Sequence, residues 1–156
     1  MLVIYTVSLD LCHAPPSNQP MTMEASSCVL PLAVCSVHGG FASPAEDFAA
    51  KRIDLTAELV RHPQATFIVR VSGDSMHGAG IDDGDLLVVD RAIKPRHGCV
   101  VVAVVDGEFA VKHLHQQFGR LKLRAANPTY PDIAPHEGQT IEIWGVVTTC
   151  IKRFSV

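Results

Sequence analysis

The sequence lacks any cluster of positive charge. Its 13 Lys and Arg residues are outnumbered by 16 Asp and Glu residues, which gives a formal net charge of −3, and no basic block occurs. Proteins that bind nucleic acid directly neutralise phosphates with clustered Lys and Arg side chains. We therefore expect no direct sequence-specific DNA binding.

Long apolar runs are missing as well. No segment reaches the roughly 18 apolar residues that a membrane helix needs. The apolar start, residues 1–5, has no basic residues around it and is soon interrupted by Asp10, which does not fit a signal peptide. We expect no membrane association.

The cysteines form no pattern typical of a disulfide framework. They are odd in number and contain no C-x-x-C pair, lying at positions 12, 28, 35, 99 and 150. Such a scattered set without a secretion signal fits a reducing compartment. The expected location is therefore the cytoplasm.

What the sequence does have is the composition of a folded protein. Of its 156 residues, 47% are apolar and 19% are charged, which is enough apolar material for one domain with a hydrophobic core. The start differs, because residues 13–27 hold three prolines among Ser, Asn and Gln residues. That stretch is typical of a flexible arm.

Short apolar runs separated by turn residues dominate from residue 66 onward. Asp106-Gly107 between two such runs is a good hairpin signal. Short helices are expected to open at residue 43 and to cover residues 54–60. The predicted fold class is mostly β: curved antiparallel sheets or a small barrel, with a flexible N-terminal arm and one or two short helices. Strands are predicted at residues 66–71, 86–90, 99–105, 109–114, 121–125 and 141–151.

Ser75 and Lys112 form the most informative pair of residues. Ser75 follows a strand-like segment in the run Val-Ser-Gly-Asp-Ser-Met, and Lys112 lies within another apolar segment. A serine hydroxyl needs a base to act as a nucleophile, and lysine can be that base only when burial keeps it neutral. The alternative for Lys112 is a solvated lysine on an edge strand, and the alternative for Ser75 is a turn serine.

Two further groups of polar residues suggest metal sites only weakly. The acidic turn Asp82, Asp83 and Asp85 lacks the EF-hand pattern and its distal Glu. His113 and His115 share a strand face but have no obvious third ligand in the sequence. We expect a solvated turn and surface histidines, with no metal and no cofactor.

Three motifs in order resemble the LexA/UmuD family of self-cleaving Ser-Lys peptidases. They are the serine motif, the acidic turn with the apolar run after it (80–90), and Val-Asp-Gly-Glu-Phe-Ala-Val-Lys at 105–112. The likeness runs from about residue 39 to 147 and is greatest to the UmuD branch. It implies a Ser75 nucleophile, a Lys112 general base and an oxyanion hole made by the backbone amides of Asp74 and Ser75.

The resemblance also implies a cleavage site. A small residue before Gly-Phe and then Ser-Pro marks the cleaved bond in this family, and the matching bond here is Gly39–Gly40. Residues 1–39 would then be a removable arm, and residues 40–156 the peptidase-like β domain. The family usually has Ala or Cys before the bond, so Gly39 is a departure. Read alone, Gly39-Gly40 is also typical of a flexible hinge.

The resemblance implies that the chain is a mutagenesis protein of the SOS response. Self-cleavage would be stimulated by RecA filaments on single-stranded DNA. The shortened product, a homodimer, would join a UmuC-like catalytic subunit as part of an error-prone translesion DNA polymerase. One alternative is a non-enzymatic dimeric polymerase-binding module of the same fold. A LexA-type repressor fits poorly, because the residues before Gly40 are few, proline-broken and not basic.

Overall fold

The computed structural model describes residues 5–6, 27–33, 50–136 and 139–155. The chain divides into two compact units, one formed by residues 1–19 and 62–156 and the other by residues 20–61. The predicted cleavage site Gly39–Gly40 and the predicted helix opening at residue 43 lie outside the described residues. Of the helices in the described ranges, none is long and apolar enough to cross a membrane.

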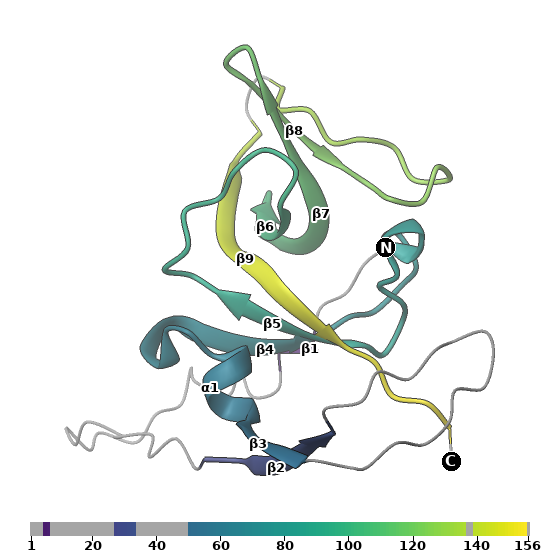
Figure 1. The fold of residues 1–156 in the computed structure, drawn as a ribbon. Helices are drawn as coiled ribbons and strands as arrows, with labels where there is room; N and C mark the ends of the chain where they lie inside the picture. The colour runs from purple at the N-terminus through teal and green to yellow at the C-terminus, as the bar shows by residue number, and fades with distance from the viewer. Residues whose placement is uncertain (1–4, 7–26, 34–49, 137–138, 156) are drawn as a thin grey trace, which may run out of the picture. The chain divides into compact units, whose positions relative to one another are not determined.

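The larger unit is built on one antiparallel sheet of seven strands (Figure 1). Its hairpins join neighbours in sequence, but the last strand inserts between two earlier ones. In sheet order the strands are β1 (Tyr5–Thr6), β4 (Thr66–Arg70), β5 (Leu86–Asp90), β9 (Ile141–Ile151), β6 (Val100–Val105), β7 (Glu108–Gln117) and β8 (Arg120–Arg124).

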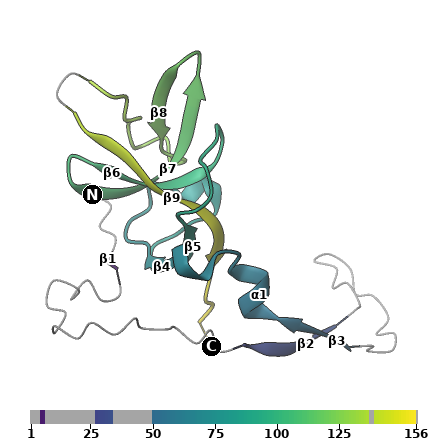
Figure 2. The same cartoon turned by 90° about the vertical axis from the view of Figure 1, so that its left-hand side faces the viewer.

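Strand β9 connects the two halves of this sheet. Its C-terminal half pairs with β5 and its N-terminal half pairs with β6. Both ladders shift register once, at Val88/Val89 and at Val102/Ala103, and such bulges bend a strand and increase its twist. Figures 1 and 2 show β9 running from β5 at one end to β6 at the other. The predicted fold class, mostly β with antiparallel curved sheets and few short helices, is confirmed.

Two apolar clusters form the core, and β6 contributes to both. Val102 packs in the first cluster, whereas Val101 and Ala103 pack in the second. Because side chains alternate along a strand, both faces of β6 are buried, which explains its unbroken apolar sequence. The other buried members of the first cluster are Val69, Val71, Met76, Ile81, Leu87, Val89 and Val111, and those of the second are Leu114, Leu123 and Val146.

A truncation in the first cluster should measure how much this core stabilises the fold. Leu87 is fully buried, so Leu87→Ala is expected to lower the free energy of unfolding by about 2–5 kcal/mol. Ile68, on the neighbouring strand β4, is 53% exposed, and Ile68→Ala should cost less than about 1 kcal/mol. Urea denaturation of both variants tests this, and equal losses would contradict the assignment of the core.

The smaller unit is a two-stranded ladder followed by a short helix. Strands β2 (Val29–Ala33) and β3 (Ala50–Asp54) are antiparallel, and α1 (Leu55–Leu59) follows at once. Asp54 caps the helix, because its side chain accepts hydrogen bonds from the amides of Thr56 and Ala57. Pro31 lies inside β2, which within the described residues pairs with β3 alone and is therefore an edge strand, where proline is tolerated.

Candidate active site

Ser75 and Lys112 meet in the larger unit, although 37 positions separate them. Lys112 Nζ donates to Ser75 Oγ at 2.8 Å and to the carbonyl of Val111 at 3.0 Å. Both residues are buried, with exposed fractions of 1% for Ser75 and 5% for Lys112. A lysine within hydrogen-bond reach of a buried hydroxyl has the geometry of a base beside a nucleophile.

The position of Lys112 explains how it can act as a base. It lies on β7, between β6 and β8 in the sheet, and pairs with Val101 of the buried strand β6. The alternative of a solvated edge-strand lysine is therefore wrong. Burial lowers the pKa of Lys112 below its ordinary value, because the interior disfavours the ammonium form. No carboxylate within the described ranges forms an ion pair with Lys112 that would reverse this effect.

A tight loop presents Ser75 to Lys112. Gly73 adopts a φ of 96°, which favours glycine, and its amide donates to the Asp83 carboxylate at 2.7 Å. Met76, next to the serine, is 1% exposed and anchors the loop in the first core cluster. Ser75 thus lies in a sharp turn that is fixed on one side by the hydrogen bond of Gly73 and on the other by the buried side chain of Met76.

The acidic turn supports the serine loop rather than standing alone in solvent. Asp83 caps the loop, while the carboxylates of Asp82 and Asp85 accept hydrogen bonds from Lys152 at 2.6 and 2.7 Å. The prediction of a plain solvated turn missed these contacts. Among the described residues, no group of three or more His, Cys, Asp or Glu side chains is placed to hold a metal ion.

The amides predicted to form an oxyanion hole are available as donors. Within the part of the chain that the structure describes, neither the Asp74 nor the Ser75 amide donates a hydrogen bond. Their carbonyls, in contrast, both accept: Asp74 from His77 N at 3.0 Å, and Ser75 from the amides of Ala126 and Asn127, each at 3.0 Å. The Asp74–Ser75 segment is therefore held by its two carbonyl groups, and its two N–H groups donate to no acceptor in the described residues. Their role in catalysis stays a prediction.

A cleft of about 390 Å³ opens onto the Ser75–Lys112 pair. Its walls are mainly apolar, with two carboxylates among the lining residues, and such a cleft suits an extended apolar segment more than a charged one. Besides Ser75 and Lys112, the lining residues are Val105, Asp106, Glu108, Phe109, Ala110, Tyr130, Pro131 and Ile133.

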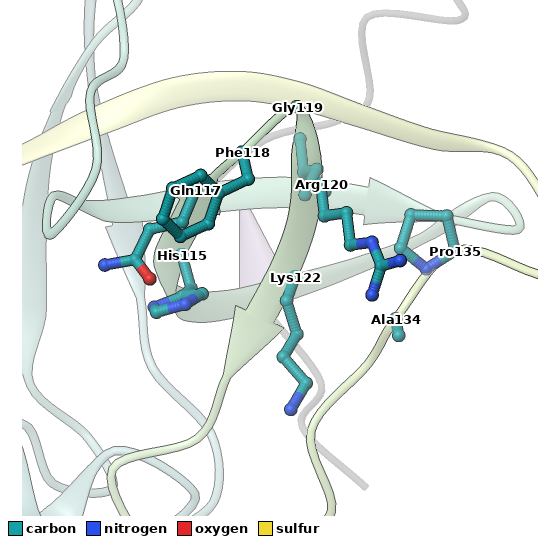
Figure 3. Close-up of a pocket in the computed structure, with 9 residues that line it drawn as sticks. His115, Gln117, Phe118, Gly119, Arg120, Lys122, Ala134 and Pro135 are labelled. Atoms are coloured by element: carbon teal, nitrogen blue, oxygen red, sulfur yellow. The ribbon is translucent and has the colours of Figure 1, made fainter.

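A second cavity, at the β7–β8 hairpin, has a different chemistry. It measures about 770 Å³, and Figure 3 shows Arg120 and Lys122 on one strand with His115 on the other. The ring of His115 contacts that of His97 edge-on, with centroids 4.8 Å apart. His115, for which a metal role was considered weak from the sequence, therefore packs against a second imidazole. Neither Ser75 nor Lys112 lines this cavity.

Two residues of the site were not found by sequence reasoning. Asn127 and Tyr130 both hydrogen-bond to Asp74, which precedes the serine. In the sequence, Asn127-Pro128 is a turn signal and nothing more. More than 50 positions separate this turn from Asp74, and no local periodicity connects two loops across such a distance.

Comparison with known proteins settles the family. A model of the family described as "Peptidase S24-like" matches residues 31–148, which is most of the chain. The chain belongs to the Peptidase S24-like family. Protein SamA of Salmonella typhimurium strain LT2 is 44% identical over 138 residues, covering 88% of this chain and 92% of SamA. The predicted membership of the LexA/UmuD group of peptidases is therefore confirmed.

Two other relatives show how the similarity is distributed. Protein MucA of Escherichia coli is 42% identical over 121 residues, which cover 76% of this chain and 82% of MucA. The LexA repressor of Syntrophotalea carbinolica is 42% identical over 88 residues, or 56% of this chain and 44% of the repressor. The similarity to SamA and MucA thus spans most of each protein, whereas less than half of the repressor is matched.

Proposed function

We propose that the protein is a serine peptidase that cleaves its own Gly39–Gly40 bond with Ser75 and Lys112. The observation that carries this proposal is the 2.8 Å contact between Lys112 Nζ and Ser75 Oγ inside the fold. Membership of a peptidase family supports it. Lys112 Nζ is the only basic group hydrogen-bonded to Ser75 Oγ among the described residues.

The reaction proceeds in two stages. Ser75 Oγ attacks the Gly39 carbonyl carbon while Lys112 Nζ takes the hydroxyl proton and becomes an ammonium group. The amides of Asp74 and Ser75 donate to the developing oxyanion. Lys112 then passes its proton to the Gly40 nitrogen, and the Gly39–Gly40 bond breaks. Water, deprotonated by neutral Lys112, then attacks the Ser75 ester. As the ester bond breaks, Lys112 returns the proton to Ser75 Oγ, and the arm leaves with a free carboxyl group at Gly39.

The substrate of this reaction is the chain's own N-terminal arm. Residues 1–39 form the part removed, and residues 40–156 form the product. A tethered substrate has a high effective concentration, so a cleft with modest affinity suffices. Two glycines at the bond offer no side chain for a specificity pocket to bind, which fits a cleft beside Ser75 whose lining is mainly apolar.

The biological setting follows from the family resemblance. Cleavage belongs to the SOS response in the cytoplasm, and RecA filaments on single-stranded DNA stimulate it. The shortened homodimer then serves a UmuC-like translesion polymerase. The alternative, a binding module that needs no cleavage, is less well supported because the buried Ser75–Lys112 contact is intact.

Incubation of the purified full-length protein at alkaline pH, with and without RecA filaments, tests the proposal. The expected product begins Gly40-Phe41-Ala42 and is identified by N-terminal sequencing and intact mass. Ser75→Ala is the control and should stay uncut under both conditions, because it lacks the nucleophile. A cut at another bond, or a cut in Ser75→Ala, would contradict the proposed reaction.

A further inference from the structure

A second loop holds the loop that carries Ser75. The backbone amides of Ala126 and Asn127 both donate to the Ser75 carbonyl at 3.0 Å. The side-chain amide of Asn127 also donates to the Asp74 carbonyl at 3.2 Å. Residues 126–127 therefore fix the carbonyl groups of both Asp74 and Ser75.

The same loop also binds the Asp74 side chain. Tyr130 Oη donates to Asp74 Oδ1 at 2.5 Å, and Asn127 Nδ2 lies 3.3 Å from Asp74 Oδ2. The hydrogen bond to Asp74 raises the pKa of Tyr130 above its ordinary value, because the carboxylate stabilises the protonated phenol. Tyr130 also lines the cleft beside Ser75. Asn127 and Tyr130, which lie in one loop, thus hydrogen-bond to both the backbone and the carboxylate of Asp74.

Planarity of the peptide bond links these contacts to the reaction. The carbonyl of Asp74 and the N–H of Ser75 belong to one rigid trans peptide unit and point in opposite directions. A donor that fixes the Asp74 carbonyl therefore also fixes the direction of the Ser75 N–H. That N–H is one of the two open donors of the proposed oxyanion hole.

We propose that Asn127 and Tyr130 are positioning residues that aim the Ser75 amide at the developing oxyanion by fixing the Asp74–Ser75 peptide. This inference rests on the proposed self-cleavage. Neither residue touches the reacting atoms. Asn127 acts on the carbonyl of the peptide, and Tyr130 acts on the side chain of the residue before the serine.

The contacts that Asn127 and Tyr130 make with Asp74 are solvent-exposed. Their loss should therefore change the direction of the Ser75 N–H more than it lowers the stability of the fold. Other groups would still hold the loop without these side chains: the His77 amide on the Asp74 carbonyl, the Asp83 carboxylate on the Gly73 amide, and the backbone amides of residues 126 and 127 on the Ser75 carbonyl. A purely structural role predicts a lower melting temperature and an unchanged rate per folded molecule. A positioning role predicts a nearly unchanged melting temperature and a lower rate per folded molecule.

The test measures the first-order self-cleavage rate of full-length variants over a series of alkaline pH values, with the folded fraction from circular dichroism. Removing an oxyanion donor outright costs about 10²–10³ in rate, so misaiming one by Asn127→Ala should slow cleavage about tenfold. Tyr130→Phe should slow it about threefold, because it loses one exposed hydrogen bond. Neither variant should shift the midpoint of the pH–rate profile, since Lys112 is unchanged. Thr129→Ala, in the same turn, is the matched control and should cleave at the wild-type rate.

Two Asp74 variants separate positioning from packing. Asp74→Asn keeps the Oδ1 acceptor for Tyr130 and should therefore slow cleavage less than Asp74→Ala, which removes both side-chain acceptors. Because Tyr130 acts through Asp74, the double variant Tyr130→Phe/Asp74→Ala should be no slower than Asp74→Ala alone. Additive losses in the double variant would contradict this inference.

The outcomes distinguish the two proposals. If the wild-type protein cleaves at Gly39–Gly40 but Asn127→Ala and Tyr130→Phe keep its rate within about twofold, the positioning role is wrong and self-cleavage stands. A shifted pH midpoint, or slowing only in proportion to lost folded protein, would overturn the positioning role in the same way. If the folded wild-type protein does not cleave, both proposals fail.

Discussion

Replacement of Lys112 by Met should abolish self-cleavage while leaving the fold intact. Methionine has a similar length and suits the buried position on β7, but it cannot take the proton of Ser75. General bases contribute about 10²–10⁴ in rate, and we expect a loss of at least about 10³-fold because Lys112 makes the only side-chain hydrogen bond to Ser75 Oγ among the described residues. The measurement is the first-order cleavage rate at alkaline pH.

An exposed lysine on the neighbouring strand provides the control for this variant. Lys122 lies on β8 and pairs with Asp132 at 2.8 Å, away from the Ser75 cleft. Lys122→Met should therefore cleave at the wild-type rate. Persistent cleavage in Lys112→Met, at more than about one tenth of the wild-type rate, would show that another group acts as the base.

The same substitution should change how stability depends on pH. The pKa of Lys112 is lowered in the folded protein, so between that value and the ordinary value of 10.5 the unfolded chain binds more protons. Wild-type stability relative to Lys112→Met should therefore rise as the pH increases through this window, and level off above it. Urea denaturation at several pH values measures the difference. A constant or falling difference would contradict a lysine that is neutral in the fold.

The second large effect is expected from Gly78→Ala. A Cβ at Gly78 would lie 2.2 Å from the backbone oxygen of Ala126, far inside any real contact, so the two loops would have to separate. Ala126 is also one of the two donors to the Ser75 carbonyl. We expect cleavage to slow at least tenfold and the free energy of unfolding to fall by about 1–3 kcal/mol.

Gly80 supplies the matched control within the same turn. Its φ of 73° makes Gly80→Ala strained, but the added Cβ meets nothing within 4 Å. That variant should lose about 1–2 kcal/mol of stability and keep most of its cleavage rate. If Gly78→Ala cleaves as fast as Gly80→Ala, the contact between the serine loop and residues 126–127 has no effect on the reaction.

The strands could be predicted because their apolar runs end at clear turn signals. The predicted runs at 86–90 and 141–151 match β5 and β9, and Asp106-Gly107 does join β6 to β7. The order of strands could not be predicted, because β9 inserts between β5 and β6 through packing of the whole sheet. Strand β2 was missed for another reason. Proline argues against a strand unless the strand lies at the edge of a sheet, and the sequence does not reveal that β2, which contains Pro31, is an edge strand.

Ser75 and Lys112 could be found in the sequence because each lies in a distinctive motif and the chemistry needs those two residue types. Their partners could not. Asp83, Asn127 and Tyr130 all support the serine loop through exposed hydrogen bonds, Asp83 from ten positions along the chain and the other two from more than 50. Such contacts depend on where the folded sheet places its loops. The sequence of a turn carries no sign of whether its residues make them.

The pH dependence of the first-order rate at which the fragment beginning Gly40-Phe41-Ala42 appears from the wild-type protein tests the central claim most directly. A buried Lys112 base predicts a rate that rises with pH to a plateau, with its midpoint below the ordinary lysine value of 10.5. Ser75→Ala should give no fragment at any pH. A rate that does not change with pH, or one that continues in Ser75→Ala, would contradict cleavage by the Ser75–Lys112 pair.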